Sequence, residues 1–209
     1  GGAWVLCVDD AAVALLVNAQ SELARIEATD ARSLVVYDRP DLTGIERFAA
    51  VESAGVCFCR ELKELRPLGR LARLRHLSLG VCPSLRSLAG LAGLAALSKL
   101  VATSCNSLTD FQELARLSSL ESLAILPESV SSWPTGAVAV HDDRMDAREL
   151  AQASGLKKLR LREVTLKHAD SLCDLRQLEE LHMLCCTCDE EPIRFGRMSN
   201  LRTLSLAPF

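Results

Sequence analysis

Cysteine and histidine are the residue types in this sequence best suited to bind a metal ion or to act in catalysis. The 209-residue chain contains nine cysteines and four histidines. Their densest group is His182, Cys185, Cys186 and Cys188, and short gaps between Cys and His are typical of zinc ligands. A zinc-finger site needs a second cysteine pair at finger spacing, and only Cys173 lies nearby. We therefore interpret these cysteines as packing and loop residues and predict no metal site.

The sequence supports neither a phosphate-binding loop nor a catalytic pair of cysteine and histidine. Residues 88–93, Leu-Ala-Gly-Leu-Ala-Gly, lack the Lys-Ser/Thr of a phosphate-binding loop, so we interpret them as repeat filler. A cysteine nucleophile needs a histidine in contact and a third group that orients it. Cys57 and His76 are the candidate pair for this role.

A run of basic residues is the third candidate for chemistry. Lys157, Lys158, Arg160 and Arg162 form this cluster, and an acidic segment, residues 141–149, precedes it. Alternate residues of a strand face one side, so Lys158, Arg160 and Arg162 can act together on one ligand. The pattern predicts a docking patch for an acidic partner segment or nucleic acid, and a solvated strand face is the alternative interpretation.

These residues must be positioned by a repeat that runs through most of the chain. Residues 71–88 follow the pattern L-x-x-L-x-x-L-x-L-x-x-C, which recurs with a period of 23 residues. Leu77 thereby corresponds to Leu100 and Leu123, and later units centre on Leu159, Leu181 and Leu204. The two leucines of L-x-L point to one face of a short strand, and stacking of neighbouring units buries that face.

The repeat resembles the leucine-rich repeat family. That resemblance implies an α/β fold, a curved horseshoe-shaped solenoid with parallel strands on the concave face and short 3₁₀, turn or helical segments on the convex face. The cysteine-containing units resemble those of F-box-type substrate receptors. The 23-residue period resembles repeats of intracellular immune receptors or of bacterial and protozoan repeat proteins, so the subfamily stays open.

One position of each unit often holds Asn in this family. It is occupied here by Cys59, Cys82, Cys105 and Cys186, whose thiols can donate weakly to a carbonyl. Three other residues stand at this position and should interrupt the series, namely Arg39, Glu128 and Asp143.

The repeat register also separates the proposed catalytic pair. His76 corresponds to Ser53, whereas Cys57 corresponds to Gly80. An offset of four residues along a strand is about 13 Å, which is too far for a hydrogen bond. We therefore predict no catalytic residue and no cofactor.

Composition narrows the class of protein further. The net charge is −3 and 49% of residues are hydrophobic, with 38 leucines against eight aromatic residues, so we expect a uniform, repeated interior. The slight acidity argues against nucleic acid as a partner. The longest apolar run, residues 11–17, is shorter than the roughly 20 residues that cross a bilayer. In-phase cysteines and the lack of Asn-x-Ser/Thr predict a reducing intracellular compartment, cytoplasmic or nuclear.

We expect a single repeat domain over residues 1–209. Residues 1–33 form an atypical N-terminal repeat or a cap, with a strand at Trp4–Val8 and a helix across residues 11–28. Residues 126–150 form an irregular repeat, with a doubtful strand around Val138 and Val140. The sequence stops just after a strand without a polar cap. This predicts a fragment of a larger protein whose open solenoid ends are covered by other domains or subunits.

Together these features predict a non-catalytic protein–protein recognition module that uses its concave surface. The candidate partner-binding residues are Lys158, Arg160, Arg162, Glu180, His182 and His76. One alternative is a structural subunit of a large assembly. Another is a substrate-receptor or sensor segment of a ubiquitin-ligase or immune-receptor-like protein.

Overall fold

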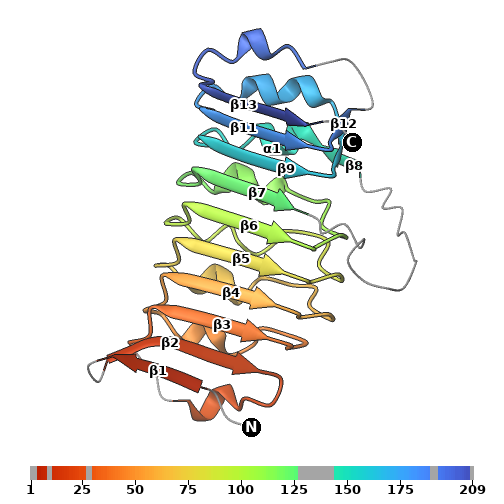
Figure 1. The fold of residues 1–209 in the computed structure, drawn as a ribbon. Helices are drawn as coiled ribbons and strands as arrows, with labels where there is room; N and C mark the ends of the chain where they lie inside the picture. The colour runs from red at the N-terminus through yellow and green to blue at the C-terminus, as the bar shows by residue number, and fades with distance from the viewer. Residues whose placement is uncertain (1–3, 9–10, 27–29, 127–143, 189–192, 208–209) are drawn as a thin grey trace.

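The chain builds one long stack of short strands (Figure 1). The computed structural model describes residues 4–8, 11–26, 30–126, 144–188 and 193–207. Ten strands form one sheet in the order β1-β2-β3-β4-β5-β6-β7-β9-β11-β13, and from β2 onward neighbouring strands are parallel. These strands are β1 (Trp4–Val8), β2 (Ala11–Asn18), β3 (Ser33–Tyr37), β4 (Ser53–Cys57), β5 (His76–Gly80), β6 (Lys99–Thr103), β7 (Ser122–Leu126), β9 (Lys158–Arg162), β11 (Glu180–Leu184) and β13 (Thr203–Ala207).

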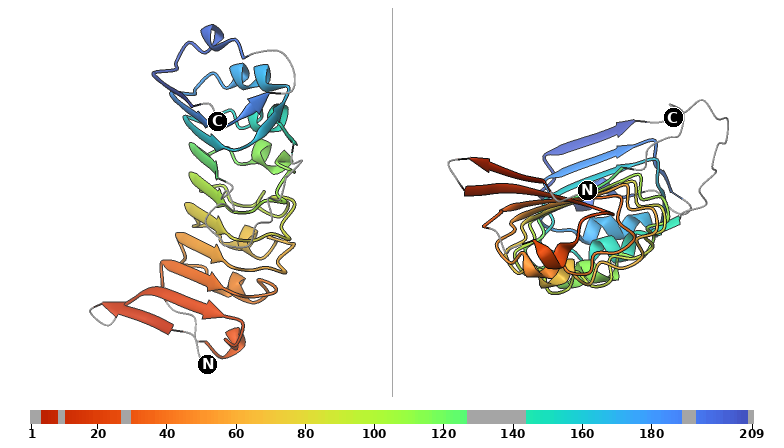
Figure 2. Two further views of the ribbon diagram at one scale, coloured as in Figure 1. Left: turned by 45° about the vertical axis from the view of Figure 1, so that its right-hand side comes forward. Right: turned by 90° about the horizontal axis from the view of Figure 1, so that it is seen from below.

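Short segments cover one face of this sheet and leave the other face open (Figure 2). They are the 3₁₀ helices η1 (Leu23–Arg25), η2 (Ile45–Arg47), η3 (Leu68–Arg70), η4 (Gln112–Arg116), η6 (Ala169–Asp174) and η7 (Phe195–Arg197), and the α-helix α1 (Ala147–Ala151). A second, parallel sheet contains β8 (Arg144–Asp146), β10 (Thr165–Lys167) and β12 (Thr187–Cys188). The predicted repeat solenoid is confirmed.

The leucines of the repeat stack in the predicted register. Leu77 pairs with Leu100, which pairs with Leu123, on adjoining parallel strands. All three are buried, as is almost every leucine in phase with them between β3 and β11. Each such side chain contributes roughly 1.5–3 kcal/mol of burial free energy before the entropy cost is subtracted. The core is therefore one continuous column rather than a single globular centre.

A left-handed turn residue follows most strands and ties each unit to the next. Its backbone N–H donates to the carbonyl of the last residue of the neighbouring strand, at 2.8–3.0 Å. A positive φ is uncommon for residues other than glycine, yet it recurs here at Asp38, Phe58, Val81, Ser104, Glu163 and Cys185. The side chain at this position is free to vary because the interaction uses only the backbone.

The series of thiols next to this turn behaves as predicted. Cys82 Sγ donates to Gly80 O at 3.5 Å and Cys105 Sγ donates to Thr103 O at 3.5 Å, with matching bonds at Cys59 and Cys186. The hydrogen bond from Cys82 to Cys105 raises the pKa of the Cys82 thiol to about 12. This thiol therefore stays protonated at neutral pH and acts as a packing group.

Arg39 interrupts the thiol series, as predicted. Its guanidinium donates to Asn18 O at 2.9 Å and to Ser21 O at 3.1 Å, while its backbone N–H donates to Cys59 Sγ at 3.4 Å. The other two predicted interruptions, Glu128 and Asp143, lie outside the described residues, as do Val138 and Val140.

Two glycines allow close approach between units on the covered side. A Cβ on Gly69 would collide with Gly90 O, and a Cβ on Gly90 would lie 2.7 Å from both N and Cα of Arg66. Gly90 also has φ +101°. The stretch interpreted as repeat filler therefore contains a position that the packing reserves for glycine.

The predicted helix across residues 11–28 is wrong. Residues 11–18 form β2, antiparallel to β1 and parallel to β3, and within the described residues 11–26 only residues 23–25 are helical. Leu15 and Val17 are buried whereas Leu16 is exposed, which is the period of two of a strand. A continuous apolar run fits either element, and pairing on both edges selects the strand here. The strand predicted at Trp4–Val8 is confirmed.

The sheet continues across the irregular segment. β7 pairs directly with β9, with Leu123 opposite Leu159. On the covered side α1 lies against η4 and η6, and Glu149 Oε2 accepts a 2.6 Å hydrogen bond from the backbone N–H of Phe111. The column of buried leucines is therefore continuous across this segment, from β7 to β9 and β11. Among the described residues, no helix has the length and apolar content needed to cross a bilayer.

Candidate functional site

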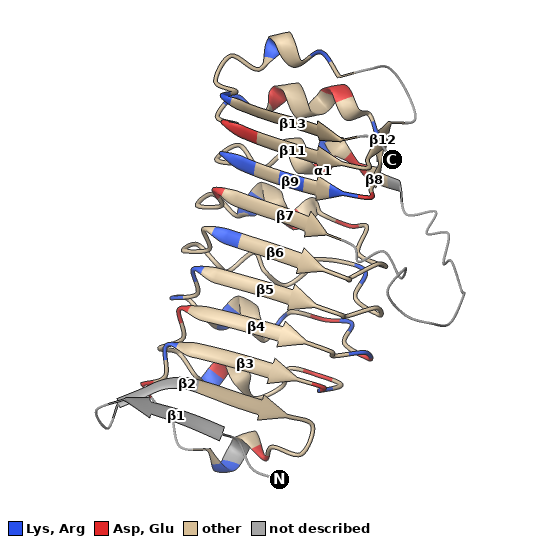
Figure 3. Cartoon of the chain, viewed as in Figure 1, with Lys and Arg blue, Asp and Glu red and all other residues tan. Residues whose placement is uncertain are grey.

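The open face of the sheet is the surface that presents side chains from many strands at once. We define it by the first, third and fifth residues of the strands, which point away from the buried leucines. Across β5, β6 and β7 its third and fifth residues are small or uncharged: Ser78, Gly80, Val101, Thr103, Ala124 and Leu126. The charged residues of the face lie mainly on β9 and at the start of β11, and Lys99 at the start of β6 is a further basic residue (Figure 3).

Strands β9 and β11 bring five of the six predicted partner-binding residues together. Lys158 lies opposite Glu180, and Arg160 lies opposite His182, on neighbouring strands. Arg162 completes the row on β9, where all three basic side chains are exposed and their neighbours Leu159 and Leu161 are buried. The sequence pattern K-L-R-L-R thus produces a basic strip because the leucines hold the strand in one register.

Most of these cations are already paired with carboxylates. Lys158 Nζ donates to Glu180 Oε1 at 2.7 Å, and Arg162 Nε donates to Glu163 Oε1 at 3.1 Å. Lys157 Nζ, beside the strip, donates to Glu121 Oε1 at 2.7 Å. The bond from Lys158 lowers the pKa of the Glu180 carboxyl, and the bond to Glu121 raises the pKa of Lys157.

Arg160 differs from its neighbours. Its side chain is exposed at the third position of β9, the eighth of the ten strands in the sheet order, and no carboxylate of the described residues lies within ion-pair distance. The nearby Glu180 feels its charge, but that carboxylate is bound to Lys158. Arg160 therefore offers a complete guanidinium, which suits a planar carboxylate held by two hydrogen bonds.

His76, the sixth predicted residue, lies apart from this group. It is the first residue of β5, three strands from β9 in the sheet order, or about 14 Å. It pairs with Ser53 whereas Cys57 pairs with Gly80, so the offset predicted between Cys57 and His76 is confirmed. Burial raises the pKa of the Cys57 thiol, which does not favour a nucleophilic thiolate.

The cysteines after β11 do not converge with His182. Cys186 turns inward and donates to Leu184 O, Cys185 occupies the left-handed turn, and Cys188 is exposed on β12. In the parts of the chain that the structure describes, no group of three or more His, Cys, Asp or Glu residues is placed to hold a metal ion.

An exposed aromatic pair on the open face was missed in the sequence. Tyr37, the last residue of β3, and Phe58, in the turn after β4, are 44% and 41% exposed. Their ring centroids are 5.2 Å apart. The register of Tyr37 with Cys57 could have placed Tyr37 on this face. Phe58 gave no signal because its orientation depends on a positive φ of 57°.

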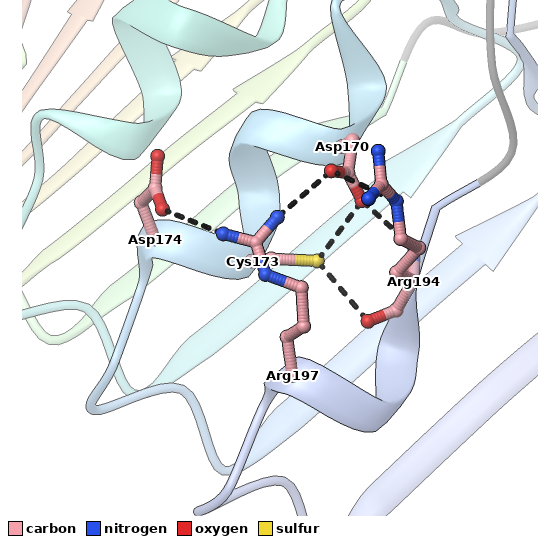
Figure 4. Close-up of polar contacts among 5 residues, drawn as sticks. All are labelled: Asp170, Cys173, Asp174, Arg194 and Arg197. Carbon is pink, nitrogen blue, oxygen red and sulfur yellow. Dashed lines mark hydrogen bonds and ion pairs between the residues drawn. The ribbon is translucent and has the colours of Figure 1, made fainter.

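A second polar cluster, on the covered side, is a structural clamp. Asp170 of η6 accepts from the backbone N–H of Arg194 and from Arg197 Nη1, both at 2.9 Å (Figure 4). Cys173 Sγ donates to Asp170 and to Arg194 O, and Arg197 also pairs with Asp174. The N–H of Arg194 lowers the pKa of Asp170. These charges satisfy one another and join the last two units.

Comparison with known proteins supports the architecture. No family model and no curated protein matches the sequence. Among solved structures, the chain is similar to the leucine-rich repeat domain of the type III effector XopL, with TM-score 0.55 and 20% identity over 83% of this chain and 62% of that one. It is also similar to TLR13 in its complex with ssRNA13, with TM-score 0.54 and 20% identity over 85% of this chain and 28% of that one.

A third similar structure is the plant peptide hormone receptor RGFR1 in complex with RGF2, with TM-score 0.52 and 14% identity. The likeness covers 83% of this chain and 27% of the receptor. The chain thus spans less than two thirds of each of these three proteins. At these identities the likeness shows the fold and leaves ligands to be argued from the residues of this chain.

Proposed function

We propose that this leucine-rich repeat solenoid is a non-catalytic recognition module that binds an acidic segment of a protein partner on the open face of its sheet. The observation that carries the proposal is Arg160, an exposed guanidinium at the third position of β9 on that face, without a carboxylate partner among the described residues. Lys158 and Arg162 flank it on the same strand. Their pairs with Glu180 and Glu163 are exposed, and exposed pairs of this kind are weak enough to exchange for a ligand.

Shape and surroundings support a protein ligand. The open face offers a row of small side chains beside the charged strip, so an extended segment can lie flat on it. RGFR1, one of the similar structures, is seen in complex with RGF2. Cys57, Cys59, Cys82, Cys105, Cys173 and Cys186 are free thiols, which agrees with the proposed reducing intracellular compartment.

The test uses a fluorescent oligoglutamate peptide as the probe, with anisotropy as the readout. The variant R160E/R162E reverses two charges of the strip, and we expect it to weaken binding by about tenfold or more. The matched control is R116E, because Arg116 is an exposed arginine in η4 on the covered side. R116E should bind the probe like the wild type. Added salt should weaken binding of the probe by the wild type and by R116E.

Two results would contradict the proposal. One is equal binding of the probe by R160E/R162E and R116E, which would mean that the strip is not the contact. The other is tighter binding of oligouridylate than of oligoglutamate, because the strip would then serve a nucleic acid. TLR13 in complex with ssRNA13 makes this second comparison worth including.

A structural subunit of an assembly is the second candidate. It is supported by β13, where Leu204 and Leu206 are exposed although their partners Leu181 and Met183 on β11 are buried. Native purification separates the two candidates. Recovery with one exchangeable ligand supports recognition, and recovery at fixed stoichiometry with several subunits supports the assembly.

A further inference from the structure

We infer that the open face holds its partner at two anchors, an apolar side chain on the pair Tyr37 and Phe58 and an acidic side chain on Arg160, about six residues apart in an extended segment. This inference rests on the proposed function, because in both proposals Arg160 binds the acidic side chain of the partner. It adds a second contact on this face and fixes the spacing between the two.

The apolar anchor is built from exposed side chains that lie side by side. Tyr37 and Phe58 form a tilted ring pair, and Leu16 is exposed on β2, where it pairs with Val35 of β3. Exposed aromatic rings in contact provide a large rigid surface, and tyrosine is enriched at binding hot spots. The partner group that fits is an aromatic or large aliphatic side chain.

The fold does not require a ring at position 58. The corresponding left-handed turn positions hold Asp38, Val81, Ser104 and Glu163, and all use the same backbone hydrogen bond. A phenylalanine at this place has an unfavourable φ and an exposed ring. The ring is 41% exposed and the hydrogen bond of the turn does not depend on it, so the open face is where its exposed part contributes.

The path between the anchors is unobstructed. Tyr37 shares its row with Cys57, Gly80 and Thr103, the last residues of successive strands. Gly80 has no side chain, and a Cβ there would lie 3.5 Å from Cys57 Sγ. A segment that crosses the strands therefore meets small groups as far as β6 and then Leu126 at the end of β7, before it reaches the strip on β9.

The spacing follows from the strand order. Phe58, the nearer ring, follows β4, which is four steps from β9 in the sheet, or about 19 Å across the strands at about 4.8 Å per step; Tyr37 on β3 is five steps away, or about 24 Å. An extended chain advances about 3.3 Å per residue, so about six residues connect Arg160 to Phe58, the nearer part of the apolar anchor. A shorter segment cannot reach both, and a longer one must form a loop.

The probes are synthetic peptides with one Trp and a short run of Glu, joined by Ser/Thr spacers that vary from none to about ten residues. The Glu run without Trp is the reference. We expect affinity to peak at a separation of about six residues and to exceed the reference by about tenfold, because the second contact is then intramolecular.

The variant Y37T/F58N removes the rings with little risk to folding. Threonine suits an exposed strand position, and asparagine tolerates the left-handed turn better than phenylalanine. This variant should bind the Trp probe no better than the reference while it keeps the affinity of the wild type for the reference. The matched control is F195L, which alters a partly exposed ring of η7 on the covered side and should leave the peak unchanged.

Affinity that does not depend on the spacer, or a peak that persists in Y37T/F58N, overturns the two-anchor inference and leaves the proposed function standing. Equal binding of the reference by R160E/R162E and the wild type overturns the proposed function itself. If none of the peptides binds at about 1 mM, both are overturned. A circular dichroism spectrum and unfolding curve for each variant show that loss of binding is not loss of the fold.

Discussion

The stacking of leucines predicts that the same truncation costs much more stability in the middle of the sheet than at its end. Leu100 lies in β6 between Leu77 and Leu123 and is 1% exposed. Leu206 lies in β13 and is 53% exposed. Both belong to the inward-facing series of the repeat, so Leu→Ala removes the same atoms from the two sites.

The expected magnitudes follow from the environments. L100A leaves a cavity closed by neighbours on both sides, which costs about 2–5 kcal/mol of unfolding free energy. L206A removes a side chain that keeps half of its surface in water and has a strand on one side only, so we expect a loss of about 1 kcal/mol or less. The difference between the two variants is more informative than either value.

Urea unfolding followed by circular dichroism measures both variants against the wild type. Because the stability of a repeat protein is close to a sum over neighbouring units, the units can unfold in more than one step. Hydrogen exchange of β5–β7 is therefore the second readout, since it reports the stability of these strands separately. Equal losses for L100A and L206A would refute the reasoning, since the central site would then gain nothing from its second neighbour.

The close contacts between turns predict that G90A lowers the free energy of unfolding by about 2 kcal/mol or more, as measured in urea. Alanine at this position would have to adopt φ +101° and place its Cβ 2.7 Å from N and Cα of Arg66. The control is G196A, which should be nearly neutral because nothing lies within 4 Å of the added Cβ. The clamp of Figure 4 predicts that D170N lowers stability at pH 7. The folded pKa of Asp170 lies below its ordinary value of 3.8, so this contribution is present above that value and is lost as the pH falls through the folded pKa. Unfolding curves of D170N and the wild type should therefore differ at pH 7 and converge in acid, and a difference that does not change with pH would contradict the ionic role.

The period of 23 residues was enough to predict the architecture because each unit repeats the same strand and turn with the same inward-facing positions. Leu77, Leu100 and Leu123 align as the period requires, and the thiols occupy the predicted turn. Prediction failed at residues 11–18, where a continuous apolar run fits a helix as well as a strand. Only pairing with β1 and β3 distinguishes the two, and pairing is a tertiary effect.

The sequence was enough to predict which strand carries the basic residues and that they share one face, but it did not predict their ion pairs. Alternation along residues 158–162 placed three cations on one face, as the structure does. The sequence does not reveal that Glu180 and Glu163 neutralise two of them, because those pairs depend on side-chain geometry. The ring contact of Tyr37 with Phe58 escaped for the same reason, since it joins two strands through a strained turn.

The most direct test of recognition on the open face is hydroxyl-radical footprinting of the chain with and without the Trp–Glu probe of about six-residue spacing. Reactivity should fall at Tyr37, Phe58 and His182 on the open face, and Phe195 on the covered side should keep its reactivity. Protection of Phe195 without protection of His182 would place the contact on the covered side and contradict the account.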